Sequence, residues 1–205
     1  MIEYVYRRVE KARLITRTAV ATDDGRIAEA VERFGGTAIM TRNDHPSGTD
    51  RLAEAVHGIS DDTLVVNVQG DEPMIDPADI DRAISAARTG SAEIVTLMTK
   101  IGTTEAADSN RVKVVTDCNG MALYFSRSKI PSKGTCFLHV GLYVYSAGFL
   151  KRFTKLERTP LEVAEGLEQL RALEHGTAFA WSRSKASLGA SIHQRIWKDF
   201  GRING

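Results

Sequence analysis

The chain has 205 residues, of which 42% are hydrophobic, and this composition suits a single domain with one substantial core. Its formal net charge of +1 gives no overall field for nucleic acid or an anionic membrane, so we expect small-molecule or protein partners. The two cysteines, Cys118 and Cys136, lack a CxxC spacing, which argues against a disulfide framework and a structural zinc site and for reduced thiols in the cytoplasm.

The amino-terminal half alternates helical and strand-like segments, and no apolar run in the sequence is long enough to span a bilayer. The spacing of apolar residues predicts helices at 2–12, 26–34, 47–56 and 77–88, and β-prone runs predict strands at 18–22, 37–40 and 63–68. Strands that alternate with helices form right-handed βαβ units on a parallel sheet. We therefore expect a mainly parallel sheet covered by helices.

The carboxyl-terminal half is richer in strands. We predict strands at 93–99, 111–116, 121–126, 138–146 and 177–182, and one helix at 161–175 that ends at Gly176. The segment 117–120 is a hairpin signal, so the first four of these strands are expected to form a smaller antiparallel extension. No internal repeat or low-complexity linker appears, so the sequence gives no support for a second domain.

The segment 65–73 is the strongest chemical signal in the chain. An apolar strand runs into Gln69, Gly70 and Asp71, and ligands bind at the carboxyl ends of strands in open α/β sheets. Gly70 allows close approach of the backbone, and Asp71 offers hard oxygen ligands to a magnesium ion that bridges substrate phosphates. The alternative is an ordinary acidic turn after a strand.

Four further segments accompany this strand end in a fixed order: 45–55, 124–131, 139–145 and 167–171. Together with 69–73 they resemble the 3-deoxy-manno-octulosonate cytidylyltransferases (CMP-KDO synthetases), and the similarity runs from Met1 to about Gly189. The resemblance implies a three-layer α/β/α fold of the nucleotide-diphosphosugar-transferase type, with a mainly parallel sheet and a smaller antiparallel extension. It also implies a homodimer.

The resemblance further implies a reaction and its residues. The activity is transfer of CMP from CTP to 3-deoxy-manno-octulosonate (KDO) for lipopolysaccharide synthesis in the cytoplasm, with Mg²⁺ bound by Asp71. The implied nucleotide-binding residues are Ser47, Gly48, Thr49, Arg51, Gln69 and Gly70. The implied sugar-binding residues are Arg127, which suits a carboxylate, and His139, Tyr143, Glu168 and Gln169, which suit hydroxyls.

Each of these residues also has a structural interpretation. Ser47 is a good helix cap, His139 on a strand is often a hydrogen-bonded structural histidine, and Tyr143 is often a core aromatic. The pair Glu168 and Gln169 also suits a solvated helix face. Only the shared order of the motifs favours the binding roles.

Both ends of the chain depart from the family pattern. The family begins with a strand and a loop containing Arg, Ser and Lys, and Met1 corresponds to the position just after it, so we expect a domain at 1–189 without that strand and loop. The family continues after Gly189 with V-D-T-P-E-D-L-E, whose aspartate is a second metal ligand. A back-translation of the tail with chosen synonymous codons encodes this motif when read from the third base, so we interpret 190–205 as a frame-shifted tail in which Asp199 is a poor substitute.

Two other functions remain open on the sequence alone. One is transfer to another acidic sugar, such as a nonulosonate of the sialic-acid type, against which the 139–145 and 167–171 motifs argue. The other is a non-catalytic remnant that binds sugar weakly or dimerises, and the two ends argue for it.

Overall fold

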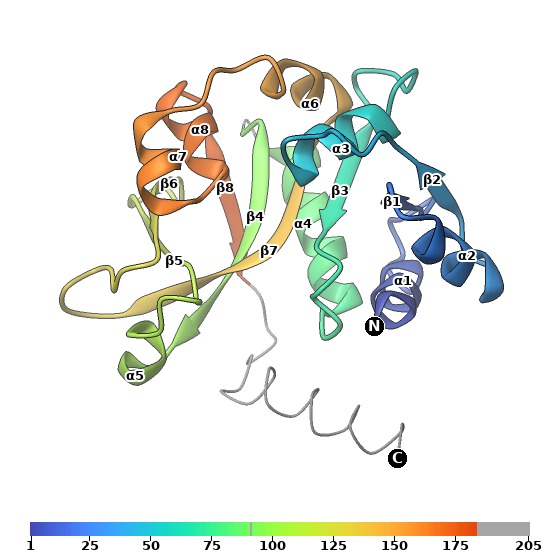
Figure 1. Ribbon diagram of the computed structural model, residues 1–205. Coiled ribbons are helices and arrows are strands. Elements are labelled where there is room, and N and C mark those ends of the chain that lie inside the picture. Colours follow the sequence, from blue (N-terminus) through green and yellow to red (C-terminus); the bar gives the residue numbers. More distant parts are fainter. Residues whose placement is uncertain (91, 184–205) are drawn as a thin grey trace.

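A computed structural model describes residues 1–90 and 92–183. The helices are α1 (Ile2–Glu10), α2 (Gly25–Arg33), α3 (Gly48–Ala55), α4 (Pro77–Thr89), α5 (Thr103–Ala106), α6 (Ala147–Phe153), α7 (Pro160–Glu165) and α8 (Gln169–Glu174). The strands are β1 (Val20–Thr22), β2 (Ala38–Met40), β3 (Leu64–Val68), β4 (Ile94–Ile101), β5 (Lys113–Thr116), β6 (Ala122–Ser126), β7 (Cys136–Ser146) and β8 (Phe179–Arg183). Figure 1 shows α7 and α8 at one side of the molecule and α1, α2, β1 and β2 at the other.

Local capping explains where the amino-terminal helices begin. The Asp24 carboxylate accepts the Arg26 backbone N–H at 2.8 Å before α2, and the Asp76 carboxylate accepts the Ala78 backbone N–H at 2.9 Å before α4, whose first residue is Pro77. Such caps satisfy backbone donors that have no partner inside the helix. The predicted helices and strands of this half are confirmed, with small shifts in their bounds.

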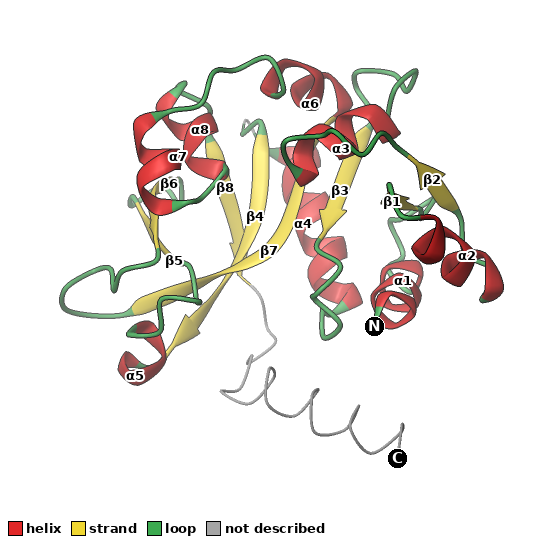
Figure 2. Cartoon of the chain, viewed as in Figure 1, coloured by secondary structure: helices red, strands yellow, loops and turns green. Residues whose placement is uncertain are grey.

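The described strands form two sheets. Strands β1 and β2 pair in parallel, while a six-stranded sheet has the order β6-β5-β7-β4-β8 with β3 paired to β7. Strand β7 is antiparallel to both β3 and β4, with Val66 and Val95 each opposite Val144. This long strand is therefore the centre of the main sheet (Figure 2).

The expectation of a mainly parallel sheet is wrong. Within residues 1–90 and 92–183, the parallel pairings are β1 with β2 and β4 with β8, and all other ladders are antiparallel. The βαβ argument correctly makes β3 and β4 point the same way, because both are antiparallel to β7. It fails because β7 lies between β3 and β4 in the sheet. Strand β7 follows β3 by almost 70 residues, and local sequence pattern does not reveal a pairing over such a separation. The segments predicted at 93–99 and 138–146, which form β4 and β7, thus belong to the main sheet and not to an extension.

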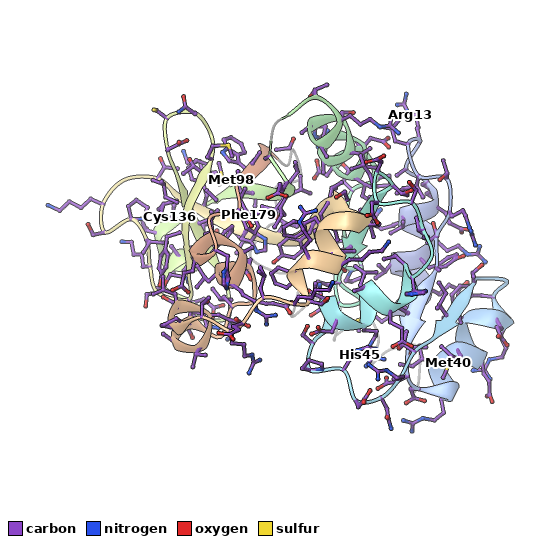
Figure 3. The ribbon with its side chains drawn as sticks, turned by 90° about the horizontal axis from the view of Figure 1, so that it is seen from above. Arg13, Met40, His45, Met98, Cys136 and Phe179 are labelled. Atoms are coloured by element: carbon purple, nitrogen blue, oxygen red, sulfur yellow. The ribbon has the colours of Figure 1, made fainter. Side chains whose placement is uncertain are left out.

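Helices cover both faces of the main sheet, which gives three layers. Alternating residues of β4 show this: Val95 and Leu97 pack with α1 and α4, whereas Ile94 and Met98 pack with α6 and α8. Figure 3 shows Met98 and Phe179, which belong to the cluster that packs with α6 and α8, on one side of the molecule, and His45 and Met40 on the other.

Three features of the carboxyl-terminal half differ from the sequence prediction. The single helix predicted at 161–175 is divided into α7 and α8, because Gly166 adopts a left-handed conformation with φ 62° that ends α7. Helices α5 and α6 were not predicted. Both are short, and α6 begins directly at the end of β7, where Ser146 Oγ accepts the Phe149 backbone N–H at 3.0 Å.

The hairpin predicted at 117–120 is confirmed. Strands β5 and β6 pair antiparallel, the Asp117 carboxylate accepts the backbone N–H groups of Asn119 and Met121 at 2.9 and 2.7 Å, and Gly120 has φ 79°. The proposed domain boundary at 189 and the tail at 190–205 lie outside the described residues. No helix of the described part is long and apolar enough to cross a membrane.

Candidate functional site

A bulge in β7 brings three predicted site segments together. The pairing jumps from Thr96 opposite Tyr143 to Leu97 opposite Val140, so β7 carries two extra residues at 141–142. Bulges of this kind redirect side chains and recur near functional sites. The sequence shows no sign of it, since its position is set by the partner strand β4.

The end of β3 rests on this bulge. The Gln69 backbone N–H donates to the Gly141 carbonyl at 3.3 Å, and a Cβ at position 141 would lie 3.1 Å from Gln69 Cγ and 3.2 Å from Glu72 Oε1. Glycine at 141 therefore allows the turn after β3 to approach the sheet closely.

A cavity of about 240 Å³, hereafter the central cavity, opens between α3, β3, β7 and α8. Five of the predicted residues line it: Thr49, Gln69, Tyr143, Glu168 and Gln169. Sequence reasoning missed Asn67 and Tyr145, which also line it. Their signal was available, because residues two apart on a strand share a face, and 67 and 145 are each two positions from a predicted residue.

Glu168 is the most constrained polar group of the central cavity. Its Oε2 accepts a hydrogen bond from Thr49 Oγ1 at 2.5 Å, which links α8 to the start of α3. Its Oε1 is buried and accepts no hydrogen bond from the described residues, although Arg171 NH2 lies 3.8 Å away. Glu168 is thus not on a solvated helix face, and its Oε1 is available to a hydroxyl donor.

A buried ion pair supports this part of the wall. Arg171 is 5% exposed and donates to both Glu162 oxygens, at 2.6 and 2.8 Å, while its guanidinium lies 4.9 Å from the centre of the Phe153 ring. The Arg171 hydrogen bonds lower the pKa of Glu162 against the opposing effect of burial. A second cavity of about 360 Å³ touches Glu162, Glu168 and Ser47 on the other side of this pair.

His139 and Tyr143 lie one behind the other. Their ring centres are 5.2 Å apart, and His139 also meets Phe125 edge-on at 5.2 Å. Burial lowers the pKa of His139 to about 4, so the imidazole is neutral at pH 7. Burial, together with the nearby Glu168 charge, raises the pKa of Tyr143, whose phenol therefore stays protonated.

The start of α3 places three predicted residues differently. Ser47 caps the helix by accepting the Asp50 backbone N–H at 3.2 Å, and Gly48 is the exposed first helical residue. Arg51 does not line the central cavity, because its guanidinium donates to Thr41 Oγ1 at 2.8 Å and pairs with Asp23 at 2.9 Å. Arg51 therefore ties α3 to β1 and to the residue after β2.

Arg127 also lies outside the residues that line the central cavity. Its side chain donates to the Glu165 carbonyl at 3.0 Å and its backbone N–H donates to Glu165 Oε2 at 2.9 Å. Lys113, fully buried, donates to the Arg127 carbonyl at 2.5 Å. Local pattern offers no reason to single out Glu165 or Lys113, which both bind the Arg127 backbone.

Gly70 and Asp71 lie in an exposed turn after β3. Asp71 makes no hydrogen bond or ion pair with any other residue of the described ranges, and no group of three His, Cys, Asp or Glu in those ranges could hold a metal by itself. A free carboxylate beside an open turn does fit magnesium that is bound mainly by substrate phosphates, because this ion commonly uses one or two protein carboxylates.

Comparison with known proteins identifies the family. Residues 1–184 match the family profile described as cytidylyltransferase. The 3-deoxy-manno-octulosonate cytidylyltransferase of Geobacter sulfurreducens is 48% identical over 86% of this chain and 77% of that protein. The protein of the same name from Syntrophotalea carbinolica is 50% identical over the whole chain and 88% of that protein. The chain belongs to the 3-deoxy-manno-octulosonate cytidylyltransferase family.

Solved structures agree with this family. The CMP:2-keto-3-deoxy-manno-octonic acid synthetase complexed with CTP superposes with a TM-score of 0.87 at 38% identity, over 99% of this chain and 87% of that one. A 4-diphosphocytidyl-2C-methyl-D-erythritol synthase superposes with a TM-score of 0.62 at 12% identity and shows a shared fold alone. The expected nucleotide-diphosphosugar-transferase-like α/β fold is therefore confirmed, while its sheet is mixed.

Proposed function

We propose that this protein transfers CMP from CTP to KDO, releasing pyrophosphate. The observation that carries the proposal is the match to a cytidylyl-transferring synthetase complexed with CTP, which extends over 99% of the chain. The central cavity supports it, because its polar wall suits a polyhydroxylated ligand: two tyrosines, three amides and Oε1 of Glu168, which accepts no hydrogen bond from the described residues.

In this reaction the anomeric hydroxyl of KDO attacks the α-phosphorus of CTP. An oxygen–phosphorus bond forms, the bond to the β-phosphate bridging oxygen breaks, and the hydroxyl proton passes to solvent. Catalysis of such a step rests on positioning and on neutralising charge. Asp71 would hold the magnesium ion, which supplies charge neutralisation at the phosphates.

The chain's own residues divide into two groups. Gln69 and Gly70, beside the bulge, and Ser47, Gly48 and Thr49, at the start of α3, are proposed to hold the nucleotide. Glu168, Gln169, Tyr143 and His139 are proposed to hold the hydroxyls of the sugar acid. Arg127 is the proposed carboxylate partner and Arg51 a proposed nucleotide contact, and each already holds protein partners that occupy some of its five N–H donors.

No covalent intermediate is needed. Cys136 is buried in a cluster with Ile101 and Ala106, and Cys118 is exposed in the β5–β6 hairpin, so neither lines the central cavity. We further propose that the protein acts in the cytoplasm and forms a homodimer, as the family resemblance implies.

The test is release of pyrophosphate from CTP and KDO in the presence of Mg²⁺, measured with a coupled assay on the full 205-residue chain. Reactions without KDO, with UTP in place of CTP, and with a sialic acid in place of KDO are the controls. Turnover that needs CTP and KDO together supports the proposal. Turnover with sialic acid alone would assign a different acidic sugar, and binding of KDO without turnover would assign a non-catalytic sugar-binding protein.

A further inference from the structure

Thr96, to which the proposed reaction assigns no role, lies at the centre of a buried hydrogen-bond network. It is 1% exposed in the middle of β4, beside the bulge of β7. Its Oγ1 is 2.7 Å from the Leu142 carbonyl oxygen and 2.9 Å from His139 Nε2, while the Val140 carbonyl is farther, at 3.5 Å. The hydroxyl thus has two close partners and only one proton to donate.

The proton assignments follow from the chemistry of the three groups. A carbonyl oxygen can only accept a hydrogen bond, so the Thr96 proton points to Leu142. The contact with His139 is then satisfied only if Nε2 carries a proton and donates it to Thr96 Oγ1. A neutral imidazole has a single N–H, so Nδ1 carries the lone pair.

We propose that Thr96 is a positioning residue that fixes His139 as the Nε2–H tautomer, so that Nδ1 can only accept a hydrogen bond. The proposal has a second part, which rests on the proposed function: the group that donates to Nδ1 is a hydroxyl of the sugar acid. A neutral acceptor nitrogen repels a carboxylate, so His139 selects hydroxyl donors and leaves the carboxylate to a cationic residue.

Two further observations agree with this role. Nδ1 has no hydrogen-bond partner among residues 1–90 and 92–183, and His139, which does not itself line the central cavity, retains 9% exposure with its ring centre 5.2 Å from that of Tyr143, which does line it. Burial lowers the pKa of His139 to about 4, which keeps the ring neutral at working pH. An imidazolium would donate from both nitrogens and could not accept from a hydroxyl.

The tautomer is read directly by ¹⁵N NMR of the imidazole nitrogens at pH 7.5. The chain has five histidines, so the His139 signals are assigned by their loss in His139→Gln. The wild type and Thr96→Ser, which keeps the hydroxyl, are expected to show a protonated Nε2 and an unprotonated Nδ1. In Thr96→Val, which has the same shape without the hydroxyl, the two tautomers should mix.

An Nδ1–H tautomer or an imidazolium in the wild type overturns the proposal, and this spectrum decides the tautomer even if Thr96→Val does not fold. An unchanged spectrum in a folded Thr96→Val removes Thr96 from the role.

Calorimetric titration with KDO tests the ligand half. Thr96→Val should bind KDO about twofold more weakly, because about half of a mixed population lacks the acceptor Nδ1, with unchanged affinity for CTP, whereas Thr96→Ser should bind like the wild type. Equal KDO affinity in wild type, Thr96→Val and His139→Gln overturns the acceptor role of Nδ1. Absence of KDO binding to the wild type overturns the proposed function and the ligand half with it, while the imidazole spectra still decide the tautomer.

Discussion

The wall of the central cavity formed by β7 and α8 differs sharply from the turn after β3. In the wall, His139, Glu168 and Arg171 are held by neighbouring side chains and are largely buried. In the turn, Gly70 and Asp71 are exposed, and the Asp71 carboxylate has no partner among the described residues. The wall therefore has its geometry before ligand binds, whereas the proposed role of the turn needs substrate phosphate and metal to complete its coordination.

This difference separates stability from activity. Changing a buried, paired group removes interactions that the folded chain already has, so it costs unfolding free energy. Changing an exposed, unpaired group costs little stability, but removes an interaction that forms during the reaction. The predictions below test this separation, beginning with the largest expected effect.

Arg171→Met should destabilise the protein by about 3–5 kcal/mol, because it leaves the Glu162 carboxylate buried without its main partner. Urea unfolding at pH 7 measures this change. The double variant Arg171→Met with Glu162→Gln should recover much of the loss, since the uncompensated charge is removed. A single variant as stable as the wild type would show that the wall is not held by this ion pair.

Asp71→Asn should lower turnover by about 10²–10³-fold, the usual effect of removing one group that stabilises developing charge. The unfolding free energy should stay within about 0.5 kcal/mol of the wild type, because the side chain has no partner to lose. Asp62→Asn, an exposed aspartate just before the other end of β3, is the matched control and should leave both quantities unchanged. Full activity of Asp71→Asn would remove Asp71 from the reaction.

His139 should make the free energy of unfolding of the protein depend on pH. Burial lowers its pKa from 6.5 to about 4 in the folded chain, so between these values the unfolded chain binds a proton that the folded chain does not. The contribution of His139 to the free energy of unfolding is therefore fully present above pH 6.5, and the free energy of unfolding falls by about 3 kcal/mol as the pH drops to 4.

Urea unfolding of the wild type and His139→Gln between pH 4 and 7.5 isolates this contribution. Glutamine does not titrate, so the difference in unfolding free energy between the two proteins should shrink as the pH falls. Parallel curves would show that His139 is not held neutral by burial.

Local signals predicted most of the elements and the family motifs, but not how they meet. The cap at Ser47 depends on neighbours in sequence and was predicted, and the structure shows it. The position of β7 between β3 and β4, and the bulge that makes Thr96 a partner of His139, depend on pairings between segments far apart in the chain. The present partners of Arg51 could not be predicted for the same reason, because Asp23 and Thr41 directly follow β1 and β2, outside the helix that carries Arg51.

Thr49 lies in the proposed nucleotide-binding segment at the start of α3, but its hydroxyl donates to Glu168, which lines the central cavity. Thr49→Val keeps the shape and removes the hydrogen bond to Glu168 Oε2, so the carboxylate loses its fixed orientation. A lost hydrogen bond to a charged group is worth about 1.5–3 kcal/mol, but the partly buried Glu168 can re-solvate, so KDO affinity should fall only about five- to tenfold. Calorimetric titration with KDO and with CTP, on Thr49→Val and Thr49→Ser, measures this effect. If Thr49→Val weakens the binding of KDO alone and Thr49→Ser restores it, Thr49 belongs to the preformed wall of the central cavity. If Thr49→Val weakens the binding of CTP alone, Thr49 contacts the nucleotide, and its hydrogen bond to Glu168 does not link α3 to sugar binding.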